Sequence, residues 1–373
     1  MRRSVLGLMT LALFLLVPGA SAQSEGRHAQ TMTVWQPGGI GDAFASIVTA
    51  TADAHRANWT RVRSGTIQMT ALTRGEEAVQ EILPGYRIPM ATLAVDPERT
   101  RSIIGDQAAD ALTAGLIVLG QSSADLRGAQ VGDVVTFFDW NFRVQEVPIG
   151  AIVPDDRVSR TEFMFSHAMG DAFGFTRLMS VWVWDVPQQD AFLIDLWQAL
   201  PDELARIRSW NDPIDPDSVQ SVIGVKERFG EFAYRPLAGD SIAIDPDWVR
   251  DNIETRTIPV LGTFRCHKDM WPLLEEAVAQ LQEAELNGKI SRSDFRSRGG
   301  CYNAREIRGG DKGGAISRHA WGVAIDINPS TNPYGGRVTM NPAVVEIFHD
   351  LGFAWGGGWT FKDGAHFEWK FDA

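Results

Sequence analysis

The chain has 373 residues, of which 44% are hydrophobic and 22% charged, and its formal net charge at pH 7 is −12. Its length exceeds that of one typical domain, so we expect at least two domains with sizeable hydrophobic cores. The acidic balance argues against a protein that grips nucleic-acid phosphates, and we expect no nucleic-acid partner. The sequence has neither an internal repeat of fixed period nor a low-complexity tract, which excludes a solenoid and a disordered tail.

Residues 1–22 have the pattern of a secretory signal peptide. Arg2 and Arg3 make a basic start, an apolar run follows over residues 5–17, and small residues precede Gln23. The run of 13 residues is shorter than the roughly 20 that span a bilayer. We therefore expect a secreted or extracytoplasmic protein of the cell envelope, with no stable membrane span after cleavage and an undetermined export route. An uncleaved N-terminal anchor is the alternative. Cleavage would leave 33 basic against 47 acidic residues, a net charge of −14.

Residues 23–257 carry no motif that assigns them a role. Short runs rich in Val, Ile and Thr are separated by Gly, Pro and Asp over residues 32–150, which is typical of β-rich structure. From about Arg160 apolar residues recur at helical spacing on both sides of a strand-like stretch, which indicates a mixed α/β segment. We expect one or two subdomains here, with a break near residues 150–160. The prolines and the acidic and amide residues of 211–218 are typical of a linker.

Residues 258–373 form a separate predicted unit. Its clearest helix lies in "KDMWPLLEEAVAQLQEAELNGKI", where Asp269 can cap the first turn, Pro272 fits that turn and Gly288 ends the helix. The expected buried face consists of Leu273, Leu274, Ala277, Val278 and Leu281. A shorter helix, "PAVVEIFHDLG", ends at Gly352.

The chain has two cysteines, Cys266 and Cys301, which are 35 positions apart. In an exported protein the default expectation is one disulfide, worth roughly 4 kcal/mol for a loop of this size. Two free buried thiols are the alternative. Two cysteines are too few for a cysteine-based structural zinc site.

Two strand patterns in this unit carry polar side chains on one face. In "GVAIDIN" the side chains alternate, so Asp326 faces away from the apolar side. His319 comes just before this strand, and Gly322 permits a bend between the two. In "AHFEWKF" the side chains of His366 and Glu368 share the face opposite to the aromatic residues. Each strand thus presents a possible metal ligand, and Glu368 is either a partner of an imidazole or a solvated residue.

A catalytic zinc ion takes three nitrogen or oxygen ligands from the protein and keeps a fourth position open for water. His319, Asp326 and His366 would supply these ligands, and the pKa of the bound water would fall from 15.7 to about 7. A base close to the ion must then take the proton. Asp363, on an Asp-Gly turn three residues before His366, is placed for that role, although Asp-Gly also occurs simply as a turn. The sequence therefore predicts Zn²⁺ as a cofactor.

The same residues resemble a family pattern. Zinc D-alanyl-D-alanine carboxypeptidases and L-alanyl-D-glutamate endopeptidases, which share their fold with the hedgehog signalling domain, have Ser-x-His-x-x-Gly-x-Ala-x-Asp followed by an acid-x-x-His. In this chain the pattern is filled by Ser317, His319, Gly322, Ala324, Asp326, Asp363 and His366. The resemblance extends over about residues 259–373 and includes "GGCYNAREIRGG". It says nothing about the rest of the chain.

By this resemblance the C-terminal domain would be α+β, with an antiparallel sheet flanked by helices, and would hydrolyse a bond in peptidoglycan stem peptides. The three metal ligands and Asp363, as general base and acid, would keep the roles given above. An arginine would stabilise the oxyanion of the tetrahedral intermediate, with Arg305 the first choice and Arg308 the second. Arg318 occupies a variable position of the pattern, and we expect it to bind substrate or solvent.

Other functions stay open at this point. The carboxypeptidases and the endopeptidases share every motif residue, so the bond that is cut is undetermined. The domain could instead be a non-catalytic, zinc-stabilised module that binds the cell wall, although a pure binder has no need of a base at Asp363. The main function could also lie in residues 23–257, as wall or partner binding. The sequence gives no signal for the oligomeric state.

Overall fold

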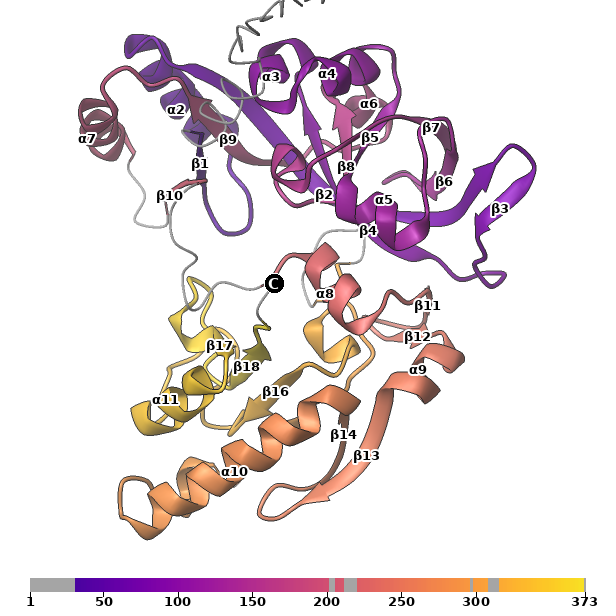
Figure 1. Ribbon diagram of the computed structural model, residues 1–373. Helices are drawn as coiled ribbons and strands as arrows, with labels where there is room; N and C mark the ends of the chain where they lie inside the picture. Colours follow the sequence, from indigo (N-terminus) through magenta and orange to yellow (C-terminus); the bar gives the residue numbers. More distant parts are fainter. Residues whose placement is uncertain (1–30, 201–204, 211–219, 296–297, 308–314, 372–373) are drawn as a thin grey trace, which may run out of the picture.

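The computed structural model describes residues 31–200, 205–210, 220–295, 298–307 and 315–371. The predicted signal peptide and the linker-like segment 211–218 lie outside these ranges. In Figure 1 the elements before residue 210 gather in the upper part of the molecule and the elements after residue 220 in the lower part. No helix in the described ranges is long and apolar enough to cross a membrane. The chain combines a large sheet with many helices, so the expected α+β class is confirmed at this level.

The upper part is built on one mixed sheet of ten described strands, in the order β10-β1-β9-β2-β4-β8-β5-β7-β6, with β3 beside β2. The strands are β1 Met32–Trp35, β2 Asn58–Arg74, β3 Glu77–Gln80, β4 Ile88–Val95, β5 Ile117–Gly120, β6 Val134–Phe138, β7 Val144–Val153, β8 Phe163–Ser166, β9 Leu178–Trp184 and β10 Arg206–Ser209. The long strand β2 pairs in succession with β9, β4 and β6, so the strands from β2 to β6 in this order close into a ring.

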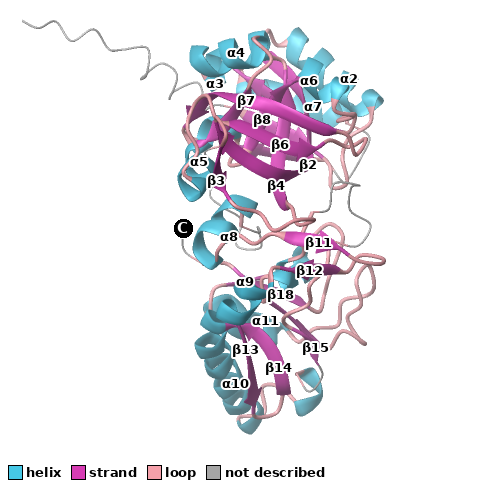
Figure 2. Ribbon diagram, turned by 90° about the vertical axis from the view of Figure 1, so that its right-hand side faces the viewer, coloured by secondary structure: helices cyan, strands magenta, loops and turns pink. Residues whose placement is uncertain are grey.

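Helices pack against this sheet (Figure 2). They are α2 Asp42–Ala54, α3 Pro97–Ile104, α4 Asp106–Thr113, α5 Gln121–Arg127, η1 Asp155–Val158, α6 His167–Ala172 and α7 Gln189–Ala199. Apolar residues of α2 and α7, such as Val48 and Leu196, share a buried cluster with Val181 of β9. Helices α3 and α4 bury Ile103 and Leu112 in a second cluster. The upper part therefore has its own hydrophobic cores.

The lower part contains a four-stranded antiparallel sheet and two hairpins. The sheet has the order β15-β16-β18-β17, and the hairpins are β11–β12 and β13–β14. The strands of the lower part are β11 Tyr234–Pro236, β12 Ile242–Ile244, β13 Ile253–Ile258, β14 Gly262–His267, β15 Arg298–Gly300, β16 Ala324–Ile327, β17 Phe353–Trp355 and β18 His366–Trp369. Its helices are α8 Val222–Phe229, α9 Pro246–Asn252, η2 Lys268–Met270, α10 Trp271–Leu286, η3 Arg292–Asp294, η4 Arg318–Ala320, α11 Pro342–Asp350 and η5 Gly356–Gly358.

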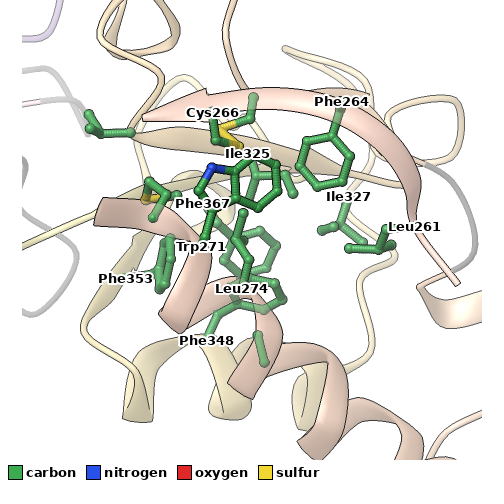
Figure 3. Close-up of a cluster of buried hydrophobic side chains, with 14 of the residues drawn as sticks. Leu261, Phe264, Cys266, Trp271, Leu274, Ile325, Ile327, Phe348, Phe353 and Phe367 are labelled. Carbon is green, nitrogen blue, oxygen red and sulfur yellow. A yellow bond between two sulfur atoms is a disulfide. The ribbon is translucent and has the colours of Figure 1, made fainter. Parts of the chain in front are cut away.

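One hydrophobic cluster holds the lower part together (Figure 3). Ile325 and Ile327 of β16, Phe367 of β18 and Phe348 of α11 are fully buried in it. The cluster also takes in residues from α8 onward, beginning with Val225. Packing in this part thus starts well before residue 258, while the domain boundary expected there stays a prediction.

Helix α10 follows the predicted pattern with two differences. Pro272 lies in its first turn, and four of the five expected core residues are buried, whereas Leu273 is only partly buried. Asp269 does not cap the helix: it lies in η2, and its carboxylate pairs with Arg228 at 2.7 Å. The 3₁₀ turn ahead of α10 places this carboxylate away from the free N–H groups of the helix. The spacing of the apolar residues predicted the helix. The position of the residues that precede it depends instead on tertiary contacts such as the ion pair between Asp269 and Arg228.

A buried network of four charges joins the two parts. Lys226 of α8, whose side chain is fully buried, lies 2.8 Å from Glu162 and 2.8 Å from Glu231, and it donates a hydrogen bond to the Pro89 carbonyl. Arg127 of α5 pairs with the same two carboxylates. Burial alone would raise the pKa of Glu231, but the charges of Arg127 and Lys226 lower that pKa to about 2. Two positive and two negative charges thus neutralise one another.

We expect this network to be sensitive to the loss of a single member. The substitution Lys226→Met leaves two buried carboxylates with one cation, and the free energy of unfolding should fall by about 3–5 kcal/mol. The double substitution Lys226→Met/Glu162→Gln restores a neutral network and should lose much less. Urea unfolding of both variants measures the difference. Equal losses in the two variants would contradict the electrostatic explanation.

Candidate metal centre

Two neighbouring strands of the small sheet bring the predicted ligands together. β16 and β18 pair antiparallel with Asp326 directly opposite His366. Residues opposite one another in such a pair project from the same face of the sheet. His319 approaches from η4, just before β16, and its ring centroid lies 5.1 Å from that of His366. One ligand atom from each of these three residues lies within 4.8 Å of the others, so they form a group that could hold a metal ion.

The bend that places His319 depends on a glycine. Gly322 has a φ of +71°, and a Cβ atom there would lie 2.6 Å from the backbone nitrogen of His267. Only glycine meets both requirements without strain. The predicted role of Gly322 between the histidine and the strand therefore has a concrete structural reason.

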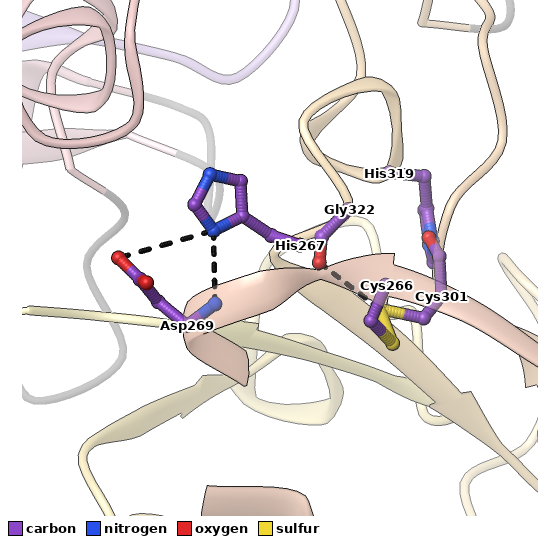
Figure 4. Close-up of a disulfide and its surroundings, with 6 residues drawn as sticks. All are labelled: Cys266, His267, Asp269, Cys301, His319 and Gly322. Atoms are coloured by element: carbon purple, nitrogen blue, oxygen red, sulfur yellow. Dashed lines mark hydrogen bonds and ion pairs between the residues drawn. A yellow bond between two sulfur atoms is a disulfide. The ribbon is translucent and has the colours of Figure 1, made fainter. Parts of the chain in front are cut away.

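A disulfide lies beside His319, and one of its cysteines contacts the imidazole (Figure 4). Cys266 and Cys301 are bonded, with their Cα atoms 5.2 Å apart, so the expected disulfide is confirmed. The Cys301 carbonyl oxygen lies 2.7 Å from Nδ1 of His319, and the ring nitrogen donates this hydrogen bond. When the imidazole is neutral, this hydrogen bond places the ring proton on Nδ1 and leaves the lone pair on Nε2. The presence of two cysteines in an exported protein predicted the disulfide, but no feature of the sequence indicated that the Cys301 carbonyl orients a histidine.

The environment of Nε2 of His319 fits a cation. This atom is buried and has no hydrogen-bond partner among the residues that the structure describes, yet it lies 3.3 Å from Oδ1 of Asp326. The two atoms are close enough to interact electrostatically, but their geometry does not suit a hydrogen bond. Two electron-rich atoms face each other at this distance, and each offers a lone pair that a zinc ion accepts from histidine and aspartate. The donor set is therefore the one that the sequence predicted for zinc.

Carboxylates surround the second imidazole. Nδ1 of His366 lies 3.3 Å from Oδ1 of Asp326, and Nε2 lies 3.4 Å from Oε2 of Glu368. Burial alone would lower the pKa of His366, but these two carboxylates outweigh it and raise the pKa to about 9. Burial alone would raise the pKa of Asp326, but the two imidazoles, when protonated, lower this pKa far below its usual range. The three side chains therefore attract a positive charge to the point where they meet.

Asp363 lies beside this group. Its backbone nitrogen donates to the Gly356 carbonyl at 2.9 Å, and its carbonyl accepts from the His366 nitrogen at 3.1 Å. Its side chain is only partly exposed, and burial raises its pKa, although the positive charges of His366 and Arg305 act in the opposite direction. A raised pKa makes a carboxylate a stronger base, which suits a group that must take a proton from water.

The arginines have different surroundings. Arg305 is half-buried, and its charge acts on Asp363, so it is close enough to influence the group electrostatically. Arg308 lies outside the described residues. Arg318 does not bind solvent freely as expected: its side chain is 11% exposed and pairs with Glu368 at 3.1 Å. Glu368 is itself buried, so it is the partner of an imidazole rather than a solvated residue.

Comparisons with known proteins bear on part of the chain. Residues 310–369 match the family described as D-alanyl-D-alanine carboxypeptidase. This segment includes the three candidate ligands and Asp363, and the match supports a peptidase-like C-terminal domain related to that family. A comparison with curated proteins gives no significant match.

One solved structure similar to the chain is the extracellular domain of the noncanonic ABC-type transporter YknZ from Gram-positive bacteria. The two chains are 11% identical over 48% of this chain and 99% of the other, with a TM-score of 0.30. A likeness of this size carries no inference about fold or function.

The raised pKa of His366 predicts how the stability of the metal-free protein depends on pH. Because the folded pKa of about 9 lies above the ordinary value of 6.5, the stabilisation is fully present below pH 6.5 and is lost as pH rises to 9. The free energy of unfolding should fall by on the order of 3 kcal/mol over that range. Chemical unfolding of the chelator-treated protein at pH 6 and pH 9 measures it, with His366→Gln as the control that should lose this decline. An equal stability at both pH values in the metal-free protein would contradict the assignment.

Proposed function

We propose that the chain is an exported zinc metallopeptidase that hydrolyses a peptide bond in peptidoglycan stem peptides, with the hedgehog-type peptidase fold in its C-terminal domain. The observation that carries this proposal is the unsatisfied Nε2 of His319, which faces Asp326 in a buried group completed by His366. The match of residues 310–369 to D-alanyl-D-alanine carboxypeptidases supports the class of substrate. The bond is that of a D-alanyl-D-alanine carboxypeptidase or of an L-alanyl-D-glutamate endopeptidase.

His319 through Nε2, Asp326 through its carboxylate and His366 through Nδ1 would hold the zinc ion. When bound, zinc supplies Lewis-acid polarisation of a peptide carbonyl and lowers the pKa of water. The Cys301 carbonyl and the Glu368 carboxylate would keep the two imidazoles in the orientations that present these nitrogen atoms. Such outer partners are as much part of a metal site as the ligands.

Asp363 would move the proton. Its carboxylate would accept a proton from the attacking water and deliver it to the nitrogen of the leaving amine, so the same group serves as base and then as acid. The partial burial that raises its pKa makes Asp363 a better base for the first of these steps. Arg305, whose charge already acts on Asp363, would place a fixed positive charge beside the oxyanion of the tetrahedral intermediate.

The Asp363→Asn variant tests these roles together with the reaction. The wild-type protein should release a product from muropeptides with pentapeptide stems, and a zinc chelator should abolish that product in mass spectra. Asp363→Asn should lower kcat by about 10²–10⁴-fold while zinc binding persists, because the base is not a ligand. Glu346→Gln, an exposed acid on α11, is the matched control and should keep full activity.

Each result of this muropeptide assay supports one function of the domain or excludes another. Loss of one terminal alanine identifies a carboxypeptidase, and release of the stem after its first alanine identifies an endopeptidase. Cleavage that resists the chelator would exclude the zinc mechanism, and full activity of Asp363→Asn would exclude Asp363 as the base. Zinc-dependent binding to peptidoglycan without any product would show that the domain is a binding module.

A further inference from the structure

Arg318 links the candidate metal centre to the preceding part of the chain. It lies in η4, next to His319, and its side chain is almost buried. Its Nε donates to Oε1 of Glu368 at 3.1 Å, and its Nη2 donates to the backbone carbonyl of Gln220 at 2.5 Å. The planar guanidinium can satisfy two partners at once in a fixed geometry, which a lysine cannot do. Arg318 is therefore held at one end by the sheet and at the other by residue 220.

Glu368 connects Arg318 to His366, one of the candidate metal ligands. One of its oxygens receives the Arg318 hydrogen bond, and the other lies 3.4 Å from Nε2 of His366. Burial alone would raise the pKa of Glu368, but the charges of Arg318 and His366 lower it, so the group is a carboxylate. Without Arg318 a buried carboxylate would lose its permanent cation and would no longer be held against the imidazole.

Gln220 connects Arg318 to helix α8, which in turn contacts the upper part of the molecule. Its side chain donates to the Phe371 carbonyl at 3.0 Å, just beyond β18. It directly precedes α8, whose first turn is capped by Ser221, and α8 carries Lys226 into the buried network with Arg127 and Glu162. The position of the Gln220 carbonyl thus depends on contacts that α8 makes with the large sheet and α5.

A second contact reaches the loop that carries Asp363. Arg206 of β10 donates to the Thr360 hydroxyl at 3.1 Å. A Cβ atom placed on Gly38, in the connection between β1 and α2, would lie 3.8 Å from the ring of Phe361. The upper part therefore contacts the loop that carries Asp363 as well as helix α8.

We propose that Arg318 is a positioning residue through which the N-terminal region, by way of α8 and Gln220, holds Glu368 and His366 in the geometry that binds the metal. This inference rests on the proposed zinc site. It assigns residues 31–210 a role as a fixed intramolecular support of the peptidase centre rather than an independent binding domain.

The first experiment measures zinc affinity of the full chain by competition with a chelator, in the wild type and in Arg318→Gln. The variant should bind zinc about 10–100-fold more weakly, as is typical when an outer partner of a ligand is lost. Its Co²⁺ derivative should show an altered visible absorption spectrum. Arg292→Gln, which breaks an ion pair with Glu285 away from the group, is the matched control and should leave both readouts unchanged.

Further variants separate positioning from general damage to the fold. Arg318→Lys keeps the charge but cannot serve both partners, and it should recover part of the affinity. The network variant Lys226→Met, which leaves two buried carboxylates with one cation, should also weaken zinc binding, whereas Lys226→Met/Glu162→Gln should weaken it less. The effect of Lys226→Met should disappear when Arg318→Gln is already present, because both act on the same link.

The outcomes distinguish the two proposals. A wild-type chain that binds no zinc overturns the proposed function and this inference with it. A wild-type chain that binds zinc, together with a folded Arg318→Gln variant of equal affinity and equal Co²⁺ spectrum, overturns the inference alone. Independent, additive effects of the network variant and Arg318→Gln would overturn the part assigned to the N-terminal region.

Discussion

The register between β16 and β18 is the constraint on which the candidate metal centre depends. Asp326 stands directly opposite His366, and Ala324 stands opposite Glu368. A shift of one residue in either strand would turn its polar side chains into the hydrophobic core and expose Ile325 or Phe367 instead. Because those apolar residues are fully buried, the core holds the register, and the register brings the ligands together.

Around this pair of strands, each imidazole has a separate support. His319 depends on the Cys301 carbonyl, which the disulfide to Cys266 ties to β14. His366 depends on Glu368 and, through Arg318, on the segment that enters α8. The first support lies within the C-terminal domain, whereas the second depends on the docking of the two parts of the chain. A metal ion would pull the two histidines together, but these contacts already present their nitrogen atoms to a common point.

The sequence predicted much of the site and less of its surroundings. Alternation in "GVAIDIN" and "AHFEWKF" was sufficient to place Asp326 and His366 on one face, because the period of a strand is two. Apolar spacing likewise predicted α10, and the count of cysteines predicted the disulfide. The predicted cap at Asp269 was wrong because its carboxylate pairs with Arg228, a residue 41 positions away. The sequence did not reveal the role of Arg318, because its partner is the backbone carbonyl of Gln220, 98 positions away, which no sequence pattern indicates.

The most direct measurement is anomalous X-ray diffraction at the zinc absorption edge from crystals of the protein grown with zinc. The proposed site predicts one strong peak at about 2.0–2.2 Å from Nε2 of His319, a carboxylate oxygen of Asp326 and Nδ1 of His366. Asp363 should lie near the peak without coordinating it. A peak at other residues, or Asp326 still paired with both imidazoles and no peak between them, would contradict the proposed metal site.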